Sequence, residues 1–491
     1  MSEIYFIDTT LRDGQQSLWA LGMKTGAMLP IAAQMDRIGF ESMEFFVSIM
    51  LKKYVREHKE NPWVWLREGT KHFRRTRLRN HGGMHGSGAM EKLPHAAMRL
   101  FVERVVFYGI TLTRTSNCWN DFEEMRDEVT ELRDIGMETV VNLIYSVSPR
   151  HTDDYYAKKV REAASIRPYR ICFKDVGGLL TPERARTLIP AILKNAGDTP
   201  VEYHAHCNNG LAPLCYLEAV KLGINALHTS IPPLANGSSQ PSILNVARNL
   251  RALGYTPVVN DEEVKPVEDH FTAVAKSEGL AIGKPFAYDE SQYLHQVPGG
   301  VISNLRHQLK LVGKQDRLQA TLEEAARVRA DFGYPIMVTP LSQFVVSQAA
   351  INVIVGERYK EVTDQVIQYA LGIWGREAPG LMEPNVKDKI LSRGRAKDWE
   401  NWRPRDLSLR EVRAKFGGAS DEELLLRVYA GTDAVNALAN EGAPRPQLDG
   451  KQPLLRLLEE LSKKKDCNQI VIRKPGLTLT LKKAPDTAAM Q

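Results

Sequence analysis

The 491-residue sequence lacks any apolar run close to the roughly 20 residues that a membrane helix needs. Its first residues, MSEIYFIDTTLRDG, are acidic where a signal peptide is basic and then apolar. The five cysteines are scattered and form no CxxC pair, so neither a disulfide framework nor a structural zinc knot is indicated. A net charge of +6 is a mild excess that does not favour a nucleic-acid-binding protein. We expect a cytoplasmic protein without membrane association.

Nucleotide-binding loops are missing as well. Neither GxGxxG nor GxxxxGK occurs, which disfavours a doubly wound open sheet. Instead, short apolar runs alternate with amphipathic helical stretches over residues 1–260, and eight such repeats predict a (β/α)₈ TIM barrel of the α/β class. The predicted strands are Ile4–Ile7, Ser42–Phe46, Arg77–Asn80, Ile110–Arg114, Glu138–Ile144, Tyr169–Phe173, Pro200–His204 and Ala226–Thr229.

The rest of the chain changes character. Residues 261–440 have long helical patterns broken by Gly- and Pro-rich joints, which predicts a helical C-terminal domain. Residues 441–491 are interpreted as a linker followed by a tail. The tail combines an amphipathic helix over 452–464 with a hairpin of strands 469–473 and 477–481, too small to be stable alone. We expect this tail to dock a carrier or partner, with a plain helix and hairpin as the alternative.

Polar side chains gather at three predicted strand ends, where barrel enzymes place their chemistry. They are Asp8, Arg12, Asp13 and Gln16 after the first strand, Lys174 and Asp175 at the sixth, and His204 and His206 at the seventh. Histidines at i and i+2 of a strand point to one face, so both can bind one metal ion. With Asp13 they form a two-histidine, one-carboxylate set. The HxH pair alone would fit ordinary surface or core histidines equally well.

These segments make the sequence recognisable. IDTTLRDGQQSL, ICFKDVGGLL, HAHCNNG and GSSQPS resemble the carboxyltransferase domain shared by pyruvate carboxylase, the oxaloacetate decarboxylase α subunit and transcarboxylase 5S. This family belongs to a wider group of metal barrels that includes isopropylmalate synthase. YLHQVPGGVISNL and YPIMVTPLSQ are similar to the family's PGG and VTPSS stretches. The resemblance covers roughly residues 3–395.

The resemblance implies a divalent metal ion held by Asp13, Lys174, His204 and His206. Zn²⁺ is expected first, with Mn²⁺ or Co²⁺ as alternatives. In the family the lysine is carbamylated, which converts an ammonium into an oxygen ligand. The isopropylmalate synthase branch lacks this lysine, so Lys174 favours the carboxyltransferase branch. The alternative is an ordinary lysine paired with Asp175.

The resemblance also implies catalytic roles for three residues. Arg12 and Gln16 match the arginine and glutamine that line the family's substrate and biotin pocket. Ser238 stands where the family has the threonine that shuttles a proton between biotin and substrate, and serine keeps that hydroxyl. Two alternatives stay open: Arg12 as a structural ion pair with a barrel carboxylate, and Ser238 as the cap of a helix beginning near Pro241.

The pocket departs from the family at several positions. In an ungapped register the family's substrate-binding arginine falls on Gly83, unless a local slip gives that role to Arg79. Asn117 and Cys207 replace aspartates, and the remaining changes put Lys52, Met90 and Gly22 at polar or charged family positions. We interpret Arg79, Asn117 and Cys207 as substrate-binding candidates in a pocket rebuilt around a GGMHGSG loop for a substrate other than pyruvate. The alternative is a barrel without catalytic activity.

The expected function is the carboxyltransferase subunit of a biotin-dependent carboxylase or decarboxylase. It would move CO₂ between carboxybiotin and a small enolisable substrate through a metal-stabilised, enolate-like intermediate. No Met-Lys-Met hairpin occurs, so biotin is expected on a separate biotin carboxyl carrier protein, together with a biotin carboxylase subunit and a homodimeric barrel. The alternatives are a biotin-free aldol-type lyase or synthase of the same barrel group, and a non-catalytic assembly subunit.

Overall fold

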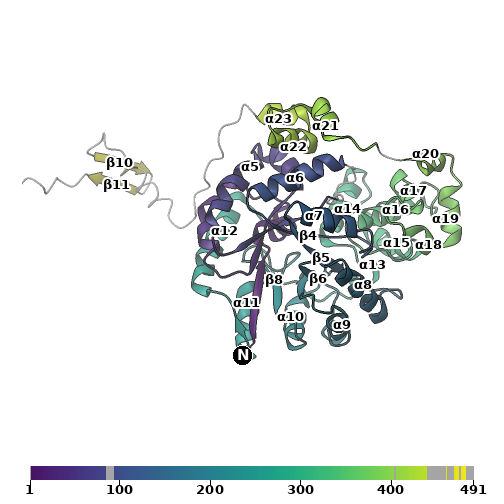
Figure 1. Ribbon diagram of the computed structural model, residues 1–491, viewed down its shortest axis with the longest axis horizontal. Helices are drawn as coiled ribbons and strands as arrows, with labels where there is room; N and C mark the ends of the chain where they lie inside the picture. Colours follow the sequence, from purple (N-terminus) through teal and green to yellow (C-terminus); the bar gives the residue numbers. More distant parts are fainter. Residues whose placement is uncertain are drawn as a thin grey trace, which may run out of the picture.

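The computed structural model describes residues 2–84, 93–402, 405–438, 461, 469–474 and 477–482. Its centre is a closed barrel of eight parallel strands (Figure 1). Each strand pairs with its neighbour in sequence, and β1 pairs with both β8 and β2 and so closes the sheet. The predicted TIM barrel is confirmed, and every predicted strand segment overlaps its strand. The strands are β1 (Glu3–Asp8), β2 (Ser42–Val47), β3 (Arg77–His81), β4 (Leu112–Thr115), β5 (Glu138–Ile144), β6 (Arg170–Asp175), β7 (Val201–Ala205) and β8 (Ala226–Thr229).

Helices surround the barrel because each buries one apolar stripe against the strands. In α11, for example, the buried positions Ile243, Val246, Ala247 and Leu250 follow the helical period. A short ninth strand, β9 (Thr256–Pro257), extends the sheet beside β1. The helices are α1 (Gln15–Trp19), α2 (Thr25–Met28), α3 (Ala32–Met35), α4 (Ile49–Lys53), α5 (Pro62–Val64), α6 (His95–Phe107), α7 (Arg126–Asp134), α8 (Asp153–Ser165), α9 (Pro182–Asn195), α10 (Ala212–Lys221) and α11 (Ile243–Ala252).

The helices after the barrel divide between two cores. α12 and α21–α23 contribute buried side chains to the barrel's own core, whereas α14–α20 bury a separate core. The described residues between 261 and 438 are therefore largely helical, and their buried side chains contribute to two cores. They comprise α12 (Asp261–Glu278), α13 (Gln292–His295), α14 (Gly299–Leu311), α15 (Leu318–Asp331), α16 (Leu341–Val355), α17 (Asp364–Ala370), α18 (Ala378–Leu381), α19 (Pro384–Leu391), α20 (Ala396–Glu400), α21 (Leu409–Phe416), α22 (Asp421–Ala430) and α23 (Thr432–Leu438).

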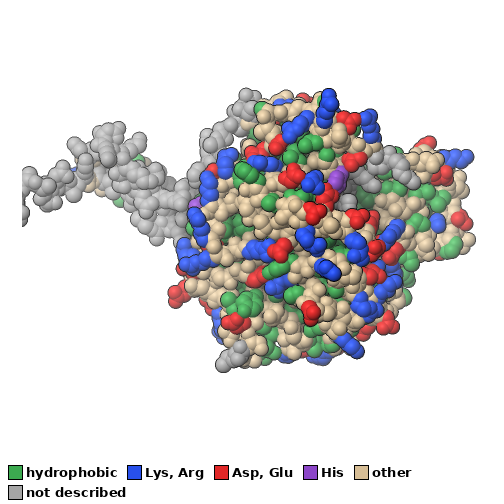
Figure 2. Space-filling view, in the orientation of Figure 1, with side chains coloured by type: hydrophobic (Ala, Val, Ile, Leu, Met, Phe, Trp, Pro, Cys, Tyr) green, Lys and Arg blue, Asp and Glu red, His purple; other side chains and the backbone are tan. Residues whose placement is uncertain are grey.

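The described part of the tail is a two-stranded antiparallel hairpin of β10 (Gln469–Lys474) and β11 (Leu477–Lys482). Apart from Leu461, the expected tail helix lies outside the described residues. Basic and acidic side chains intermingle over the face of the molecule seen in Figure 2. None of the described helices is both long and apolar enough to cross a membrane.

Candidate metal centre and active site

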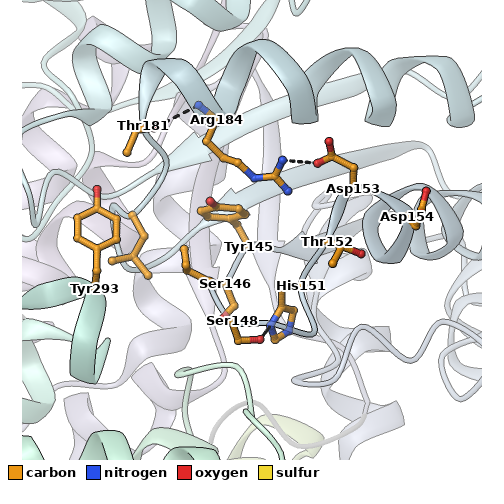
Figure 3. Close-up of a pocket in the computed structure, with 12 residues that line it drawn as sticks. Tyr145, Ser146, Ser148, His151, Thr152, Asp153, Asp154, Thr181, Arg184 and Tyr293 are labelled. Carbon is orange, nitrogen blue, oxygen red and sulfur yellow. Dashed lines mark hydrogen bonds and ion pairs between the residues drawn. The ribbon is translucent and has the colours of Figure 1, made fainter.

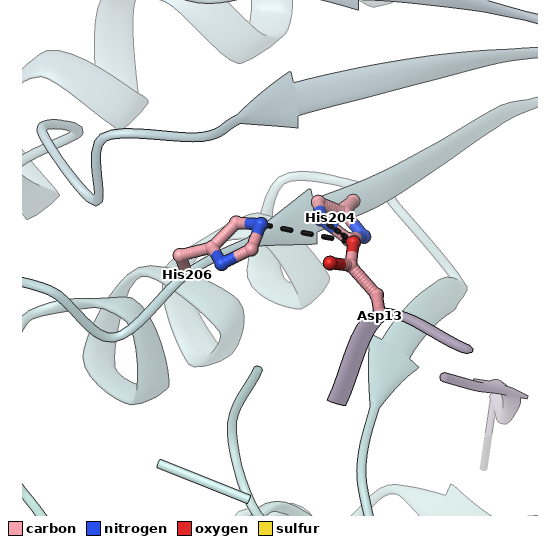
Figure 4. A group of neighbouring side chains, drawn as sticks. All are labelled: Asp13, His204 and His206. Carbon is pink, nitrogen blue, oxygen red and sulfur yellow. Dashed lines mark ion pairs between the residues drawn. The ribbon is translucent and has the colours of Figure 1, made fainter. Parts of the chain in front are cut away.

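A carboxylate and two imidazoles converge at the carboxyl end of the barrel (Figure 4). Asp13 lies on a single π-helical turn, η1 (Thr10–Gly14), that directly follows β1. His204 lies on β7 and His206 follows it by two positions, so the strand's period brings both rings to one face. The Nε2 atoms of His204 and His206 lie 3.3 and 3.7 Å from Oδ2 of Asp13. This is the geometry of a site for one cation with open positions.

The protonation of these groups suits a metal ion. Burial lowers the pKa of both histidines below the usual value, which keeps the rings neutral. Burial alone would raise the pKa of Asp13, but the positive charge of Arg12 opposes it, and that pKa lies well below its usual range. Nδ1 of His206 lies 2.7 Å from the Ser238 carbonyl and donates to it, which leaves the Nε2 lone pair facing Asp13. The donors are thus an ionised carboxylate and neutral imidazoles, as divalent metals require.

Lys174 completes the arrangement from the neighbouring strand. It stands on β6 in register with His204 on β7. Burial, followed by the positive charge of Arg114, lowers its pKa to about 8. Asp175 instead accepts the backbone N–H groups of Leu179 and Leu180, so it does not serve as the partner of Lys174. Within the described part of the chain, the Lys174 amine makes no hydrogen bond or ion pair.

A buried ion network supports the carboxylate of Asp13. Glu44 on β2 accepts from Nε of Arg12 and Nε of Arg114, each at 2.7 Å. Nη2 of Arg12 also lies 3.0 Å from Oδ2 of Asp13. All four side chains are at most 7% exposed. The ion pair foreseen as the alternative role of Arg12 is therefore present, and it fixes the guanidinium beside the site.

A cavity of about 530 Å³ opens above these residues, between the barrel mouth and α14. Six residues expected at the site line it: Arg12, Asp13, Gln16, Lys174, His206 and Ser238. His204 is fully buried behind Asp13. The segments recognised as PGG and VTP also reach the cavity, through Gly299 and Thr339. Ser238 donates its hydroxyl to the Ser17 carbonyl at 2.9 Å, and Ser242 rather than Ser238 is the N-cap of α11.

Comparison with known proteins agrees with this geometry. Residues 3–270, more than half of the chain, match the family described as HMGL-like, and residues 293–442 match a conserved carboxylase domain. A pyruvate carboxylase subunit from Methanocaldococcus jannaschii is 34% identical over 392 residues, which are 80% of this chain and 69% of that protein. The chain belongs to the family of carboxyltransferase domains of biotin-dependent carboxylases.

Two further relatives extend the comparison. The 2-oxoglutarate carboxylase large subunit of Hydrogenobacter thermophilus is 32% identical over 445 residues, covering 86% of this chain and 66% of that one. The carboxyl transferase domain of Rhizobium etli pyruvate carboxylase, solved with pyruvate, shares the fold with a TM-score of 0.79. It is 23% identical and covers 89% of this chain and 77% of its own. Family membership makes the protein an enzyme, a carboxyltransferase of the biotin-dependent carboxylase type that uses a divalent metal.

Three expected substrate-binding residues do not line the cavity. Arg79 is fully buried inside the barrel, where two carboxylates hold its guanidinium. The side chain of Asn117 accepts from the backbone N–H groups of Trp119 and Asp121 and so stabilises its own turn. Cys207 is only 2% exposed, and burial raises the pKa of its thiol. The sequence placed Arg79 within the third strand and Asn117 and Cys207 just after strands, but it did not show where their side chains point.

At the edge of the cavity near β3, the structure shows two features that the sequence did not predict. Gly83 lines the cavity, and a Cβ there would lie 1.8 Å from Oε1 of Glu128, whose carboxylate also accepts from the Met84 N–H. An arginine therefore does not fit at Gly83 unless Glu128 moves. His81 also lines the cavity; burial and Arg12 lower its pKa well below the usual value, so the ring is neutral. Residues 85–92, including Met90, lie outside the described residues.

A second cavity of about 600 Å³ lies at the ends of β5 and β6 (Figure 3). Its arginine, Arg184, is ion-paired with Asp153. Its histidine, His151, is bonded to the Ser148 hydroxyl at 2.6 Å, and burial lowers its pKa to about 3. Among the described residues, the two groups that could hold a metal ion lie elsewhere. This cavity therefore presents fewer groups that could bind a metal ion or react with a substrate than the cavity above Asp13.

Proposed function

We propose that the protein transfers a carboxyl group between carboxybiotin, presented by a separate carrier, and a small enolisable substrate other than pyruvate. The observation that carries the proposal is the convergence of Asp13, His204 and His206 beneath a cavity that Arg12 and Ser238 also line. In this proposal Asp13, His204 and His206 hold one divalent cation, Zn²⁺ first and Mn²⁺ or Co²⁺ as alternatives. When bound, the cation supplies Lewis-acid polarisation of a substrate oxygen.

Lys174 supplies the fourth ligand as a carbamate. The neutral amine adds to CO₂ and loses a proton, which creates an anionic oxygen ligand where an ammonium would repel the cation. A pKa of about 8 keeps a much larger fraction of the amine neutral at pH 7 than an ordinary lysine has. The absence of a described ion-pair partner leaves the amine available for this reaction.

The remaining residues orient the substrate and move a proton. Arg12, which Glu44 and Asp13 hold in place, lines the cavity and orients the substrate by hydrogen bonding rather than by a free positive charge. Gln16 stands at the exposed edge of the cavity, on the side from which biotin would enter. The Ser238 hydroxyl lines the same space and can relay the proton between the substrate carbon and the biotin nitrogen.

Substrate choice follows from the charges in the cavity. Arg12 is already neutralised by two carboxylates, and Lys174 is committed to the cation. Gly83 supplies no side chain, and the other described lining residues are uncharged apart from the metal-binding triad. A buried 2-oxo acid carboxylate would therefore lack a full partner, at a cost of about 3–5 kcal/mol. We expect kcat/KM for pyruvate to be at least about 100-fold below that of the natural substrate.

The partners are a biotin carboxyl carrier protein and a biotin carboxylase, with the barrel itself a homodimer in the cytoplasm. Two similar proteins are named as subunits, which supports an assembly of several chains. No Met-Lys-Met motif occurs among these 491 residues. Retention on streptavidin through a biotinylated partner tests this proposal. Turnover that is independent of any biotinylated protein would favour a biotin-free lyase.

The central experiment measures metal content and turnover in matched variants. His204→Ala should lose both the cation and activity, because an open position cannot replace a missing ligand. His307→Ala, an exposed residue on α14, is the control and should lose neither. Ser238→Ala should keep the metal but lose turnover, and Ser238→Thr should restore it because the hydroxyl returns. A metal-free wild-type protein with full activity would refute the proposal.

A further inference from the structure

A buried chain of hydrogen bonds runs away from the metal-binding side of His204. Its other nitrogen, Nδ1, lies 3.2 Å from Nδ1 of His228 on β8. Nε2 of His228 lies 2.8 Å from Oε1 of Glu202, which stands two residues before His204 on the same face of β7. The three side chains are completely buried. No solvent can replace these contacts, so their hydrogen bonds must be satisfied among themselves.

Only one arrangement of protons lets His204 bind a metal ion and also satisfies this series of hydrogen bonds. If His204 ligates through Nε2, the nitrogen nearest Asp13, its proton resides on Nδ1 and is donated to His228. His228 then accepts at Nδ1 and carries its own proton on Nε2, which it donates to Glu202. Each neutral ring donates once and accepts once. The opposite arrangement would place a proton on His204 Nε2, where the cation must bind.

Arg79 fixes Glu202, the member of this hydrogen-bond series that lies farthest from the metal site. Its Nη1 and Nη2 atoms donate to the two oxygens of Glu202 at 2.7 and 3.0 Å. A carboxylate held by a two-pronged contact keeps its orientation and its charge. Oε1 of Glu202 therefore remains aimed at His228 and accepts from it. This contact explains why Arg79 is buried, which was not expected of a substrate-binding residue.

We propose that Glu202 and His228 are positioning residues that set the tautomer and ring orientation of His204 for metal binding. Both act through His204 and touch neither substrate nor cation. The proposal rests on the metal site in the proposed function and adds residues that determine its affinity. Metal-ligating histidines commonly donate their second N–H to a polar partner, and an imidazole–carboxylate pair fills that place here.

The same residues do not make a second metal site. Cys172, Glu202 and His228 lie close enough together to share a cation. However, Arg79 already occupies both oxygens of Glu202, and Nη1 of Arg114 lies 3.8 Å from Sγ of Cys172. Burial raises the pKa of that thiol to about 12, so it stays protonated and is a poor ligand.

The test compares Zn²⁺ affinity, by chelator competition, in full-length variants. His228→Leu removes both hydrogen bonds and should weaken Zn²⁺ binding about 10–100-fold. His228→Gln should bind nearly as tightly as the wild type, because its amide can accept from His204 and donate to Glu202. His270→Gln changes a buried histidine on α12 that is bonded to the Ala27 carbonyl, and it should leave the affinity unchanged. Unchanged affinity in His228→Leu would overturn the proposal.

Two further measurements keep the result decisive. In Co²⁺-loaded protein the visible absorption bands should shift in His228→Leu but not in His270→Gln, because only the first alters the orientation of a ligand. If the leucine variant does not fold, His228→Asn replaces it. Asparagine is too short to reach both partners, so it should bind Zn²⁺ about tenfold more weakly than glutamine, and equal affinities would overturn the proposal. A wild-type protein that binds none of Zn²⁺, Mn²⁺ and Co²⁺ would instead refute the proposed function.

Discussion

Replacing Glu44 by glutamine should destabilise the whole barrel. This carboxylate is fully buried and is the common partner of Arg12 and Arg114, at 2.7 Å from the Nε atom of each. A glutamine retains one acceptor oxygen, so one arginine would face an N–H₂ group and remain without a full counter-charge. Removing one partner of a buried ion pair costs about 3–5 kcal/mol. The unfolding entropy of a chain this long is about 1 kcal/mol/K, so the melting temperature should fall by about 3–5 °C.

The pH dependence of the free energy of unfolding provides a second test of this prediction. Burial alone would raise the pKa of Glu44, but Arg114 and then Arg12 outweigh it and lower that pKa. A carboxylate whose pKa is lower in the folded state contributes stability above its unfolded-state pKa of about 4.3. That contribution is lost as the pH falls through the folded-state pKa. The stability difference between wild type and Glu44→Gln should therefore be full at pH 7 and shrink below about pH 4.

Urea unfolding followed by circular dichroism measures this difference. Glu268→Gln is the matched control, since Glu268 forms an ion pair with Lys265 on the surface of α12. An exposed pair of this kind is worth about 0–1 kcal/mol. A loss in Glu44→Gln no larger than that of the control would refute the reasoning, because it would mean that the buried arginines find other partners. A loss that persists unchanged at pH 3 would refute the electrostatic origin.

Three further predictions concern other parts of the molecule. Asp36→Asn should cost about 1–3 kcal/mol in urea unfolding, because its carboxylate accepts backbone N–H groups from Arg74 to Thr76 just before β3; an unchanged midpoint would contradict this. Lys174→Ala should abolish the stimulation of metal uptake by bicarbonate, measured by elemental analysis, and uptake that still responds to bicarbonate would exclude the carbamate. Deleting residues 450–491 should leave metal content intact but weaken co-purification with a biotinylated partner; unchanged assembly would show that the tail is not the docking element.

The barrel and the convergence of Asp13, His204 and His206 could be predicted from the sequence because the signals are local. Eight apolar runs alternating with helical stretches predicted the closed sheet, and parallel strands place their carboxyl ends at one rim. Asp13 follows the first strand, and His204 and His206 are two residues apart on the seventh. The strand's period of two puts both rings on one face, so the three side chains could be expected to meet without knowledge of any long-range contact.

The roles of the buried arginines and of the groups behind His204 were decided only by the tertiary structure. Arg79 and Glu202 are 123 positions apart, and Arg114 and Glu44 are 70 apart. Nothing local distinguishes an arginine that reaches the cavity from one that is held inside the barrel by a carboxylate. Closure of the sheet brings these strands face to face, and the cost of leaving a buried charge unpaired then selects the partners. The sequence alone could therefore place charges at the barrel mouth, whereas their pairing needed the closed barrel.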